Sequence, residues 1–317
     1  MRAFHPTDGL YAAFVTLSPS PPGLSTAPRQ VALFGAGYVG TALARVLLER
    51  GQRVIALTRN PERAAELSAA GARVVVADLA SPAWHGEIGT VDGVVNCVSS
   101  GGGGPDGYRH SYVEGARSIL TWLARVGPPE ALVYTSSTSV YPQHGGVVDE
   151  DSPTDAAVGN ALFLLEAERL MAGAPASGRA RRACILRLAG IYGPGRHHLL
   201  DQLRVGTMAF PGRGDHRLNL AHRDDIVAAL LLALEQGPDG ATTLNVADDA
   251  PTPKAEVVAW LAARLGVPAP VFSGVTMPGR RAETPDRTVC NRRIKQVLGW
   301  RPRYPDFRAG YEAILGA

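Results

Sequence analysis

The chain has 317 residues, 45% of them hydrophobic, and its formal net charge is +3. This composition supplies material for a sizeable packed core and excludes a disordered or fibrous chain. The small charge, without a dense run of lysine or arginine, gives no footprint for nucleic acid, and no apolar run is long enough to span a membrane.

Residues 1–28 differ from the rest of the chain. A short apolar run there is followed by Ser18-Pro19-Ser20-Pro21-Pro22-Gly23, which predicts a disordered tail. Three cysteines, Cys97, Cys184 and Cys290, are odd in number and far apart in the sequence. They indicate a protein of the reducing cytoplasm, with no disulfide framework and no metal site.

From residue 29 onward, short apolar runs alternate with helical patterns. Strands are predicted at 30–34, 53–58, 72–77, 92–98, 131–136 and 183–188, and helices between them at 38–50, 61–70, 108–126 and 159–172. Strands that are almost continuously apolar are typical of a parallel sheet covered on both faces. The alternation predicts an α/β fold, a Rossmann-type doubly wound parallel sheet, over residues 29–189.

After residue 190 the pattern becomes mixed. A helix is expected after His222, a strand at 242–247, and helices at 254–265, 291–298 and 306–315, with loops at 266–280 and 299–305. Residues 190–317 are therefore predicted to form mostly a smaller, substrate-side α/β region. This region is interleaved with the sheet domain and covers the carboxyl edge of the sheet.

The first predicted strand runs into a Gly-x-Gly-x-x-Gly turn that opens the first helix. Gly35 permits the tight turn, Gly37 lets a pyrophosphate approach the backbone, and Gly40 lets helix and strand pack closely. The amides of the first helical turn, at Tyr38 and Val39, then face the phosphates. The strand–turn–helix context predicts a dinucleotide site.

The end of the second strand bears on which dinucleotide binds. An acidic residue there would bond the ribose 2′-hydroxyl of NAD, but the strand ends Ala56-Leu57-Thr58-Arg59-Asn60. A guanidinium can pair with a 2′-phosphate, so Arg59 favours NADP over NAD. The alternative is that Arg59 is only a solvated residue before the helix. Asp78 and Leu79, after the third strand, are placed to reach the adenine, and Asp78 alternatively caps the following turn.

Several sequence motifs, in their order along the chain, resemble those of the extended and atypical short-chain dehydrogenases/reductases. This group includes NAD-dependent epimerases and dehydratases. Beyond the glycine turn, these motifs occupy 95–99, 134–141, 187–196, 219–225 and 245–249. The resemblance implies that Cys97, Val98 and Ser99 lie against the nicotinamide ribose. It also implies a small-molecule substrate and a homodimer.

The family normally carries a Tyr-x-x-x-Lys pair, in which the lysine lowers the pKa of the tyrosine that moves the proton. In the register set by Glu166-Ala167-Glu168-Arg169-Leu170, Asn160 stands at the tyrosine position and Leu164 at the lysine position. The only lysines of the chain are Lys254 and Lys295, and neither has a tyrosine four residues before it. The chain therefore resembles the atypical branch, which often lacks this pair.

Other residues remain as candidates for the chemistry. Ser137 aligns with the family's catalytic serine, and it either bonds the substrate or satisfies the end of its strand. Tyr141 and Tyr192 lie in loops near the expected cleft, and either is a candidate proton donor. His222 is either a general base or, as we prefer, a cap at the start of a helix.

The resulting hypothesis is an NADP-preferring, epimerase/dehydratase-like oxidoreductase with a non-standard proton donor. Its substrate would be a small carbonyl or hydroxyl compound or one like a sugar nucleotide. The alternative is a catalytically inactive protein that senses NADP(H) or acts as a scaffold, which the substitutions at Asn160 and Leu164 favour.

Overall fold

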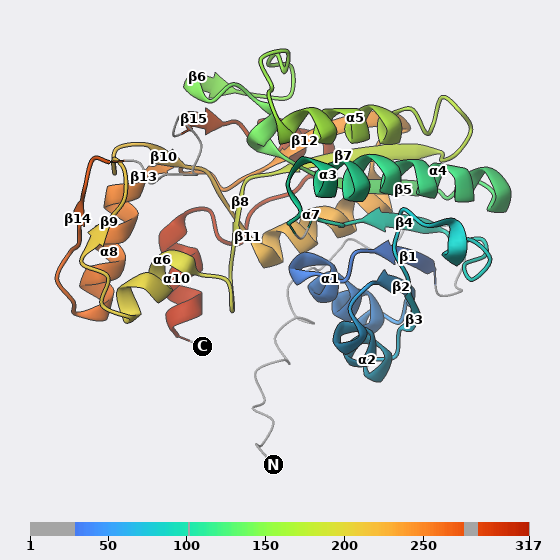
Figure 1. Cartoon of the computed structure of the whole chain (residues 1–317), viewed down its shortest axis with the longest axis horizontal. Helices are drawn as coiled ribbons and strands as arrows, with labels where there is room; N and C mark the ends of the chain where they lie inside the picture. Colours follow the sequence, from blue (N-terminus) through green and yellow to red (C-terminus); the bar gives the residue numbers. More distant parts are fainter. Residues whose placement is uncertain (1–28, 101, 276–284, 317) are drawn as a thin grey trace.

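The computed structural model describes residues 29–100, 102–275 and 285–316, so the predicted tail at 1–28 lies outside the described residues. A seven-stranded sheet forms the centre, in the order β12-β7-β5-β4-β1-β2-β3, with every pairing parallel (Figure 1). Its strands are β1 Gln30–Phe34, β2 Arg53–Thr58, β3 Arg73–Val76, β4 Gly93–Asn96, β5 Ala131–Ser137, β7 Arg182–Leu188 and β12 Gly240–Val246.

Helices cover both faces of this sheet because consecutive strand residues point to opposite sides. In β1, Val31 and Leu33 join a core with helices α1, α7 and α9, whereas Ala32 and Phe34 join a core with α4 and α5. The helices around the sheet are α1 Tyr38–Glu49, α2 Pro61–Ala69, α3 Gly104–Tyr108, α4 Gly115–Val126, α5 Asn160–Ala172, α7 Arg223–Gln236 and α9 Arg292–Leu298. Fully buried strands of this kind explain the continuous apolar runs in the sequence.

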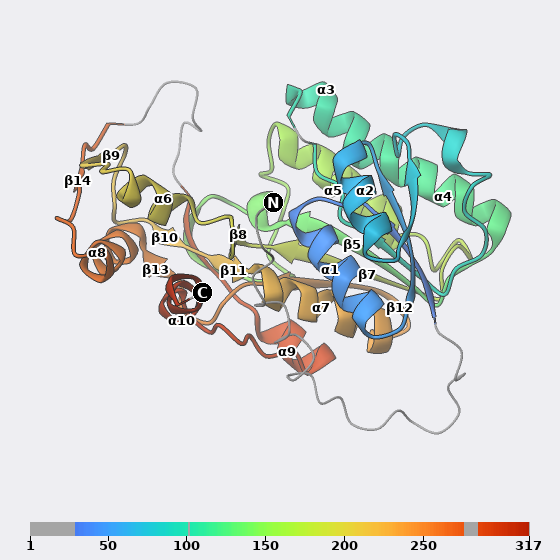
Figure 2. The ribbon, with the colours of Figure 1, turned by 90° about the horizontal axis from the view of Figure 1, so that it is seen from below.

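A second body of the molecule is built around its own apolar core and lies beside the carboxyl edge of the sheet (Figure 2). Its helices are α6 His198–Arg204, α8 Lys254–Leu265 and α10 Phe307–Leu315. Short strands lie within this body or between it and the sheet domain: β6 His144–Val148, β8 Gly190–Tyr192, β9 Ala209–Phe210, β10 Arg217–Leu218, β11 Leu220–His222, β13 Thr252–Pro253, β14 Val271–Phe272 and β15 Asp286–Val289. The chain crosses between the two bodies, since β12, α7 and α9 return to the sheet.

The predicted Rossmann-type fold is confirmed, and the main strands and helices match their predicted ranges to within about two residues. The predicted helix 108–126 is instead interrupted, because α3 is followed by a π-helical segment, Arg109–Glu114, before α4 begins. Among the described residues, no helix combines the length and apolarity needed to cross a membrane.

The order of the strands creates a crevice at one point of the sheet. The chain moves outward from β1 through β2 to β3, and then returns to the other side of β1 to form β4. Connections leave in opposite directions at this switch point, so the carboxyl ends of β1 and β4 open a crevice in which α/β proteins bind ligands.

Candidate active site

The glycine turn lies at the carboxyl end of β1, against the end of β4. Gly35 has φ +94°, and a Cβ there would lie 2.6 Å from the amide nitrogen of Val98. A Cβ on Gly40 would overlap the carbonyl oxygen of Gly35, so this glycine lets α1 sit directly on the turn. At Gly37, by contrast, a Cβ would meet no atom within 4 Å. The turn is therefore packed on two sides and open at Gly37.

The N-terminus of α1 faces this open side. Gly37 is its N-cap, no side chain of the described residues caps it, and the first helical turn holds no acidic residue. The amides of Tyr38 and Val39 therefore remain available, at the positive end of the helix dipole. This arrangement suits the pyrophosphate of a dinucleotide.

The ends of β2 and β3 bring Arg59 and Asp78 together. The Arg59 guanidinium lies 3.5 Å from the Asp78 carboxylate, and His110 Nε2 lies 3.0 Å from both carboxylate oxygens. Partial burial raises the pKa of Asp78, but the bonds from His110 and from the Ala80 amide outweigh burial, and the pKa is lowered. Asp78 thus caps the following turn, as the alternative interpretation held, and Arg59, half exposed, also faces solvent. Leu79 is buried in the core beside α4.

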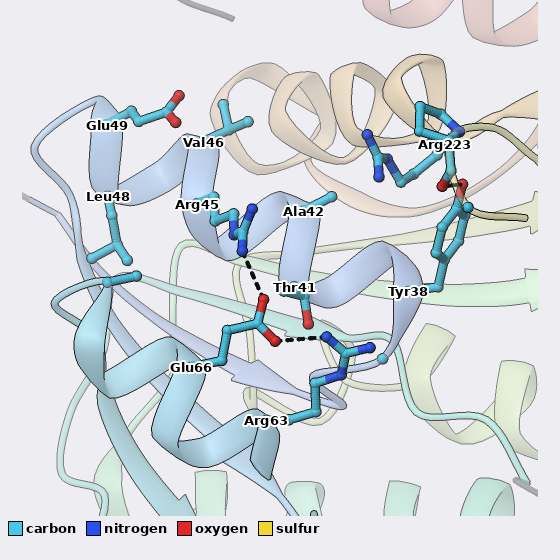
Figure 3. Close-up of a pocket in the computed structure, with 14 residues that line it drawn as sticks. Tyr38, Thr41, Ala42, Arg45, Val46, Leu48, Glu49, Arg63, Glu66 and Arg223 are labelled. Carbon is cyan, nitrogen blue, oxygen red and sulfur yellow. Dashed lines mark hydrogen bonds and ion pairs between the residues drawn. The ribbon is translucent and has the colours of Figure 1, made fainter. Parts of the chain in front are cut away.

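A groove of about 820 Å³ runs between α1 and α2 from Gly37 (Figure 3). Glu66 bridges two arginines across it, at 2.7 Å from Arg45 and 2.6 Å from Arg63. At the end of the groove next to Gly37, the Tyr38 hydroxyl donates to the carbonyl of Pro194 at 2.9 Å. Tyr38 therefore ties the start of α1 to the loop that leads into the second body.

A second cavity, the Asn160 pocket, lies where α5 begins. Its volume is about 420 Å³, and it is lined by Tyr108, Ser139, Tyr141, Gln143, Ala156, Ala157, Val158, Asn160, Ala161 and Leu164. Leu164 is only 4% exposed and lies one helical turn after Asn160. The two positions of the family's tyrosine–lysine pair therefore face this pocket, but with an amide and an isobutyl group in place of the pair.

Tyr141 lines this pocket, but its hydroxyl is engaged elsewhere. It donates to Asn245 Oδ1 at 2.8 Å, and the Arg187 guanidinium lies 4.8 Å from the ring centre. Burial raises the pKa of Tyr141, and Arg187 and Asn245 offset only part of that rise. Ser137 Oγ accepts a bond from the Ser139 amide at 3.1 Å, so it satisfies the end of β5.

Tyr192 lies in the core of the second body, outside the lining of the Asn160 pocket. Its ring packs against His222 and Tyr311, its hydroxyl lies against the backbone at Gly310, and burial raises its pKa. His222 accepts a bond from the Asp224 amide at 3.3 Å, and burial lowers its pKa to about 4. The preferred interpretation of His222 as a helix cap is confirmed.

A buried ion pair, not predicted from the sequence, lies next to the Asn160 pocket, because its arginine contacts the ring of Tyr141. Glu168 of α5 bonds Arg187 of β7 at 2.7 Å and accepts a bond of 2.5 Å from Ser136 of β5. Both charged side chains are less than 10% exposed. The sequence signal was present, since Arg187 is a charge within the apolar run of β7, but its partner could not be identified without the packing of α5.

Asp248, which follows β12, is buried. We therefore expect the stability of the protein to depend on pH through this carboxyl group. Burial raises its pKa to about 8 from the ordinary 3.8, although amides of Ala250 and Leu220 oppose the change. The folded chain therefore binds a proton that the unfolded chain releases between about pH 4 and 8, so this contribution to stability is lost as the pH rises through that interval.

We expect Asp248→Asn to be more stable than the parent at pH 9 by about 2 kcal/mol. Its stability should also no longer fall between about pH 4 and 8 on account of this residue. Urea unfolding at pH 5, 7 and 9 measures both. Exposed Asp239→Asn is the matched control, and equal behaviour of the two variants would contradict the buried-carboxyl argument.

These features define a doubly wound α/β protein with an open dinucleotide turn and a pocket at the same sheet edge. A model of the NAD dependent epimerase/dehydratase family matches residues 33–247. The chain belongs to this family, so the resemblance to the extended short-chain dehydrogenases/reductases is confirmed.

Two relatives and one solved structure illustrate the range of the family. The 3-diazoavenalumate denitrifying reductase of a Streptomyces species is 28% identical, over 86% of this chain and 96% of its own. The 2-alkyl-3-oxoalkanoate reductase of Stenotrophomonas maltophilia is 30% identical, over 74% of each chain. MoeE5 in complex with UDP-glucuronic acid and NAD superposes with a TM-score of 0.78 at 25% identity, covering 89% of this chain and 96% of that one.

Proposed function

We propose that this chain is an NADP-preferring oxidoreductase that interconverts a carbonyl and a hydroxyl group on a small organic substrate in the Asn160 pocket. One observation carries the proposal: the open glycine turn and the Asn160 pocket lie at the same carboxyl edge of the sheet, flanking the end of β4. Two of the relatives are named as reductases, which supports a reduction.

The residues at the crevice fit a dinucleotide. The amides of Tyr38 and Val39 would hold the pyrophosphate, with the free space at Gly37 admitting it. Cys97, Val98 and Ser99, after β4, would lie beside the nicotinamide ribose. When bound, the reduced nicotinamide supplies a hydride to the substrate.

The lining of the Asn160 pocket favours one of the two substrate classes. Among its described residues none is charged: apolar side chains alternate with the neutral groups of Ser139, Gln143 and Asn160. A nucleotide diphosphate would call for cationic partners, so a small uncharged carbonyl compound fits better. Burial of such a substrate among alanine and leucine side chains also excludes bulk water from the reacting group.

Binding and turnover test this function separately. Protein stripped of nucleotide is titrated with NADPH and NADH by nicotinamide fluorescence, and a panel of aldehydes, ketones and 3-oxo esters is then screened for loss of NADPH absorbance. We expect micromolar or tighter binding of NADPH and turnover of at least one compound. Tight binding without turnover over the panel would instead support the NADP(H)-sensing alternative.

The cofactor preference depends on Arg59. Replacing Arg59 with alanine is expected to weaken NADPH binding about tenfold or more, the equivalent of about 1.4 kcal/mol, while NADH binding changes little. Exposed Arg53, at the opposite end of β2, is the matched control as Arg53→Ala. An unchanged ratio of the two dissociation constants in Arg59→Ala would refute the NADP assignment. A cytoplasmic location and a homodimer remain further parts of the proposal.

A further inference from the structure

We propose that Tyr108 is the catalytic proton donor of the Asn160 pocket. The inference rests on the proposed function. Two tyrosines line the cavity, and no histidine, lysine, aspartate or glutamate does so among the described residues. The hydroxyl of Tyr141 is bonded to Asn245, whereas the hydroxyl of Tyr108 makes no hydrogen bond to another residue of the described chain.

The position of Tyr108 is fixed by the helix after β4. Gly102, Gly103 and Gly104 all have positive φ, and Gly103 is the N-cap from which α3 begins. Helix α3 then packs beside α5, as both views show (Figures 1 and 2). Tyr108 is the last residue of α3 and lines the same pocket as Asn160, which stands at the position of the family's tyrosine.

The helical backbone becomes irregular immediately after Tyr108. The helix widens to the π form immediately after it, over Arg109–Glu114, and single π turns inside helices recur at functional sites. Its ring contacts that of Tyr112, with centroids 5.3 Å apart. Tyr112 contacts Tyr108 and Tyr141 lines the same pocket, and burial raises the pKa of both Tyr112 and Tyr141.

Among the described side chains that line this pocket, the phenols are the strongest acids. The Asn160 amide and the Ser139 hydroxyl can bond a substrate oxygen, but neither gives up a proton at accessible pH, whereas a tyrosine titrates near pH 10. As a hydride adds to the carbonyl carbon, the Tyr108 O–H bond breaks and its proton passes to the carbonyl oxygen. The products are an alcohol and oxidised nicotinamide, and water returns a proton to the phenolate.

The test compares Tyr108→Phe with the parent and with Tyr311→Phe, which removes a buried phenol from the core of the second body. Using the most active compound of the carbonyl panel, we expect Tyr108→Phe to lose at least about 100-fold in kcat. Its NADPH dissociation constant should stay within twofold, because the phenyl ring keeps the contact with Tyr112. Tyr311→Phe should retain parental kcat.

The pH dependence of the reduction rate distinguishes proton donation by Tyr108 from a purely structural role, which would leave that dependence unchanged. Reduction by the parent should fall above the phenol pKa, and 3-fluorotyrosine at position 108, a more acidic phenol, should shift that fall to lower pH. This second variant keeps the test decisive even if Tyr108→Phe does not fold.

The outcomes separate the two proposals. Suppose that the parent reduces a compound. If Tyr108→Phe then retains more than half of the parental kcat, or if 3-fluorotyrosine leaves the pH profile unshifted, the role of Tyr108 alone is overturned. A parent protein that binds NADPH but reduces no compound would overturn the proposed reaction itself, and the role of Tyr108 with it.

Discussion

Replacing Glu168 with glutamine is expected to destabilise the protein by about 3 kcal/mol, because it leaves Arg187 as an uncompensated buried charge. Glu168 accepts bonds from both Arg187 and Ser136, and both members of the ion pair are nearly inaccessible to solvent. Glutamine has the same shape but offers one amide oxygen in place of a carboxylate. Urea unfolding monitored by circular dichroism measures the loss.

A variant on the same helix supplies the control. Glu166 bonds Arg117 at 2.8 Å on the exposed face of α5, and exposed ion pairs contribute about 1 kcal/mol or less. Glu166→Gln should therefore be nearly neutral. Adding Arg187→Met to Glu168→Gln should recover part of the stability, since both charges are then gone. Equal losses in the two glutamine variants would contradict this account.

The Glu168–Arg187 ion pair also contacts a residue that lines the Asn160 pocket. The guanidinium of Arg187 lies over the ring of Tyr141, whose hydroxyl is bonded to Asn245 of β12. The chain of contacts from α5 through β7 to β12 therefore fixes one wall of the Asn160 pocket. It also occupies the hydroxyl that the sequence had made a candidate proton donor.

The large elements of the fold were predictable because their signals are local. In β1, a run such as Val31-Ala32-Leu33-Phe34 has to be buried on both faces, and such strands need helices on both sides of the sheet. The start of α1 was equally clear from Gly37 and Gly40, whose spacing encodes the turn. These signals need no knowledge of distant residues.

The short strands of the second body could not be predicted in this way. Strand β6 pairs with β15, more than 130 positions away along the chain, and β9 pairs with β14 over two residues each. Segments this short carry no readable alternation, so their pairing depends on where the larger elements place them.

The candidate site was predictable only in part for the same reason. The run of residues on α5 that sets the register placed Asn160 and Leu164 at the family's tyrosine and lysine positions, and the structure shows that both line one pocket. The engagement of Tyr141 depends on Asn245, 104 positions later. Tyr108 has no motif of its own, and it reaches the pocket only through the irregular helix after β4.

Substitutions in the glycine turn should separate folding from cofactor binding. At Gly40 an alanine methyl would overlap the Gly35 carbonyl, which belongs to the backbone and cannot rotate away. Helix α1 would have to move off the turn, at a cost of about 1–3 kcal/mol. We expect Gly40→Ala to show a lowered unfolding midpoint together with loss of NADPH binding.

At Gly37 the same methyl group would meet no atom of the protein, and the backbone there has φ −85°, which alanine adopts freely. Gly37→Ala should therefore unfold within about 1 kcal/mol of the parent, the difference expected for a changed N-cap. Its methyl would nevertheless stand between the amides of α1 and an approaching pyrophosphate, so NADPH affinity should fall more than about tenfold. Isothermal titration of NADPH beside urea unfolding measures both quantities. Unchanged affinity in Gly37→Ala would show that the dinucleotide does not cross the turn at this residue, and the assignment of the amides at Tyr38 and Val39 would then fail.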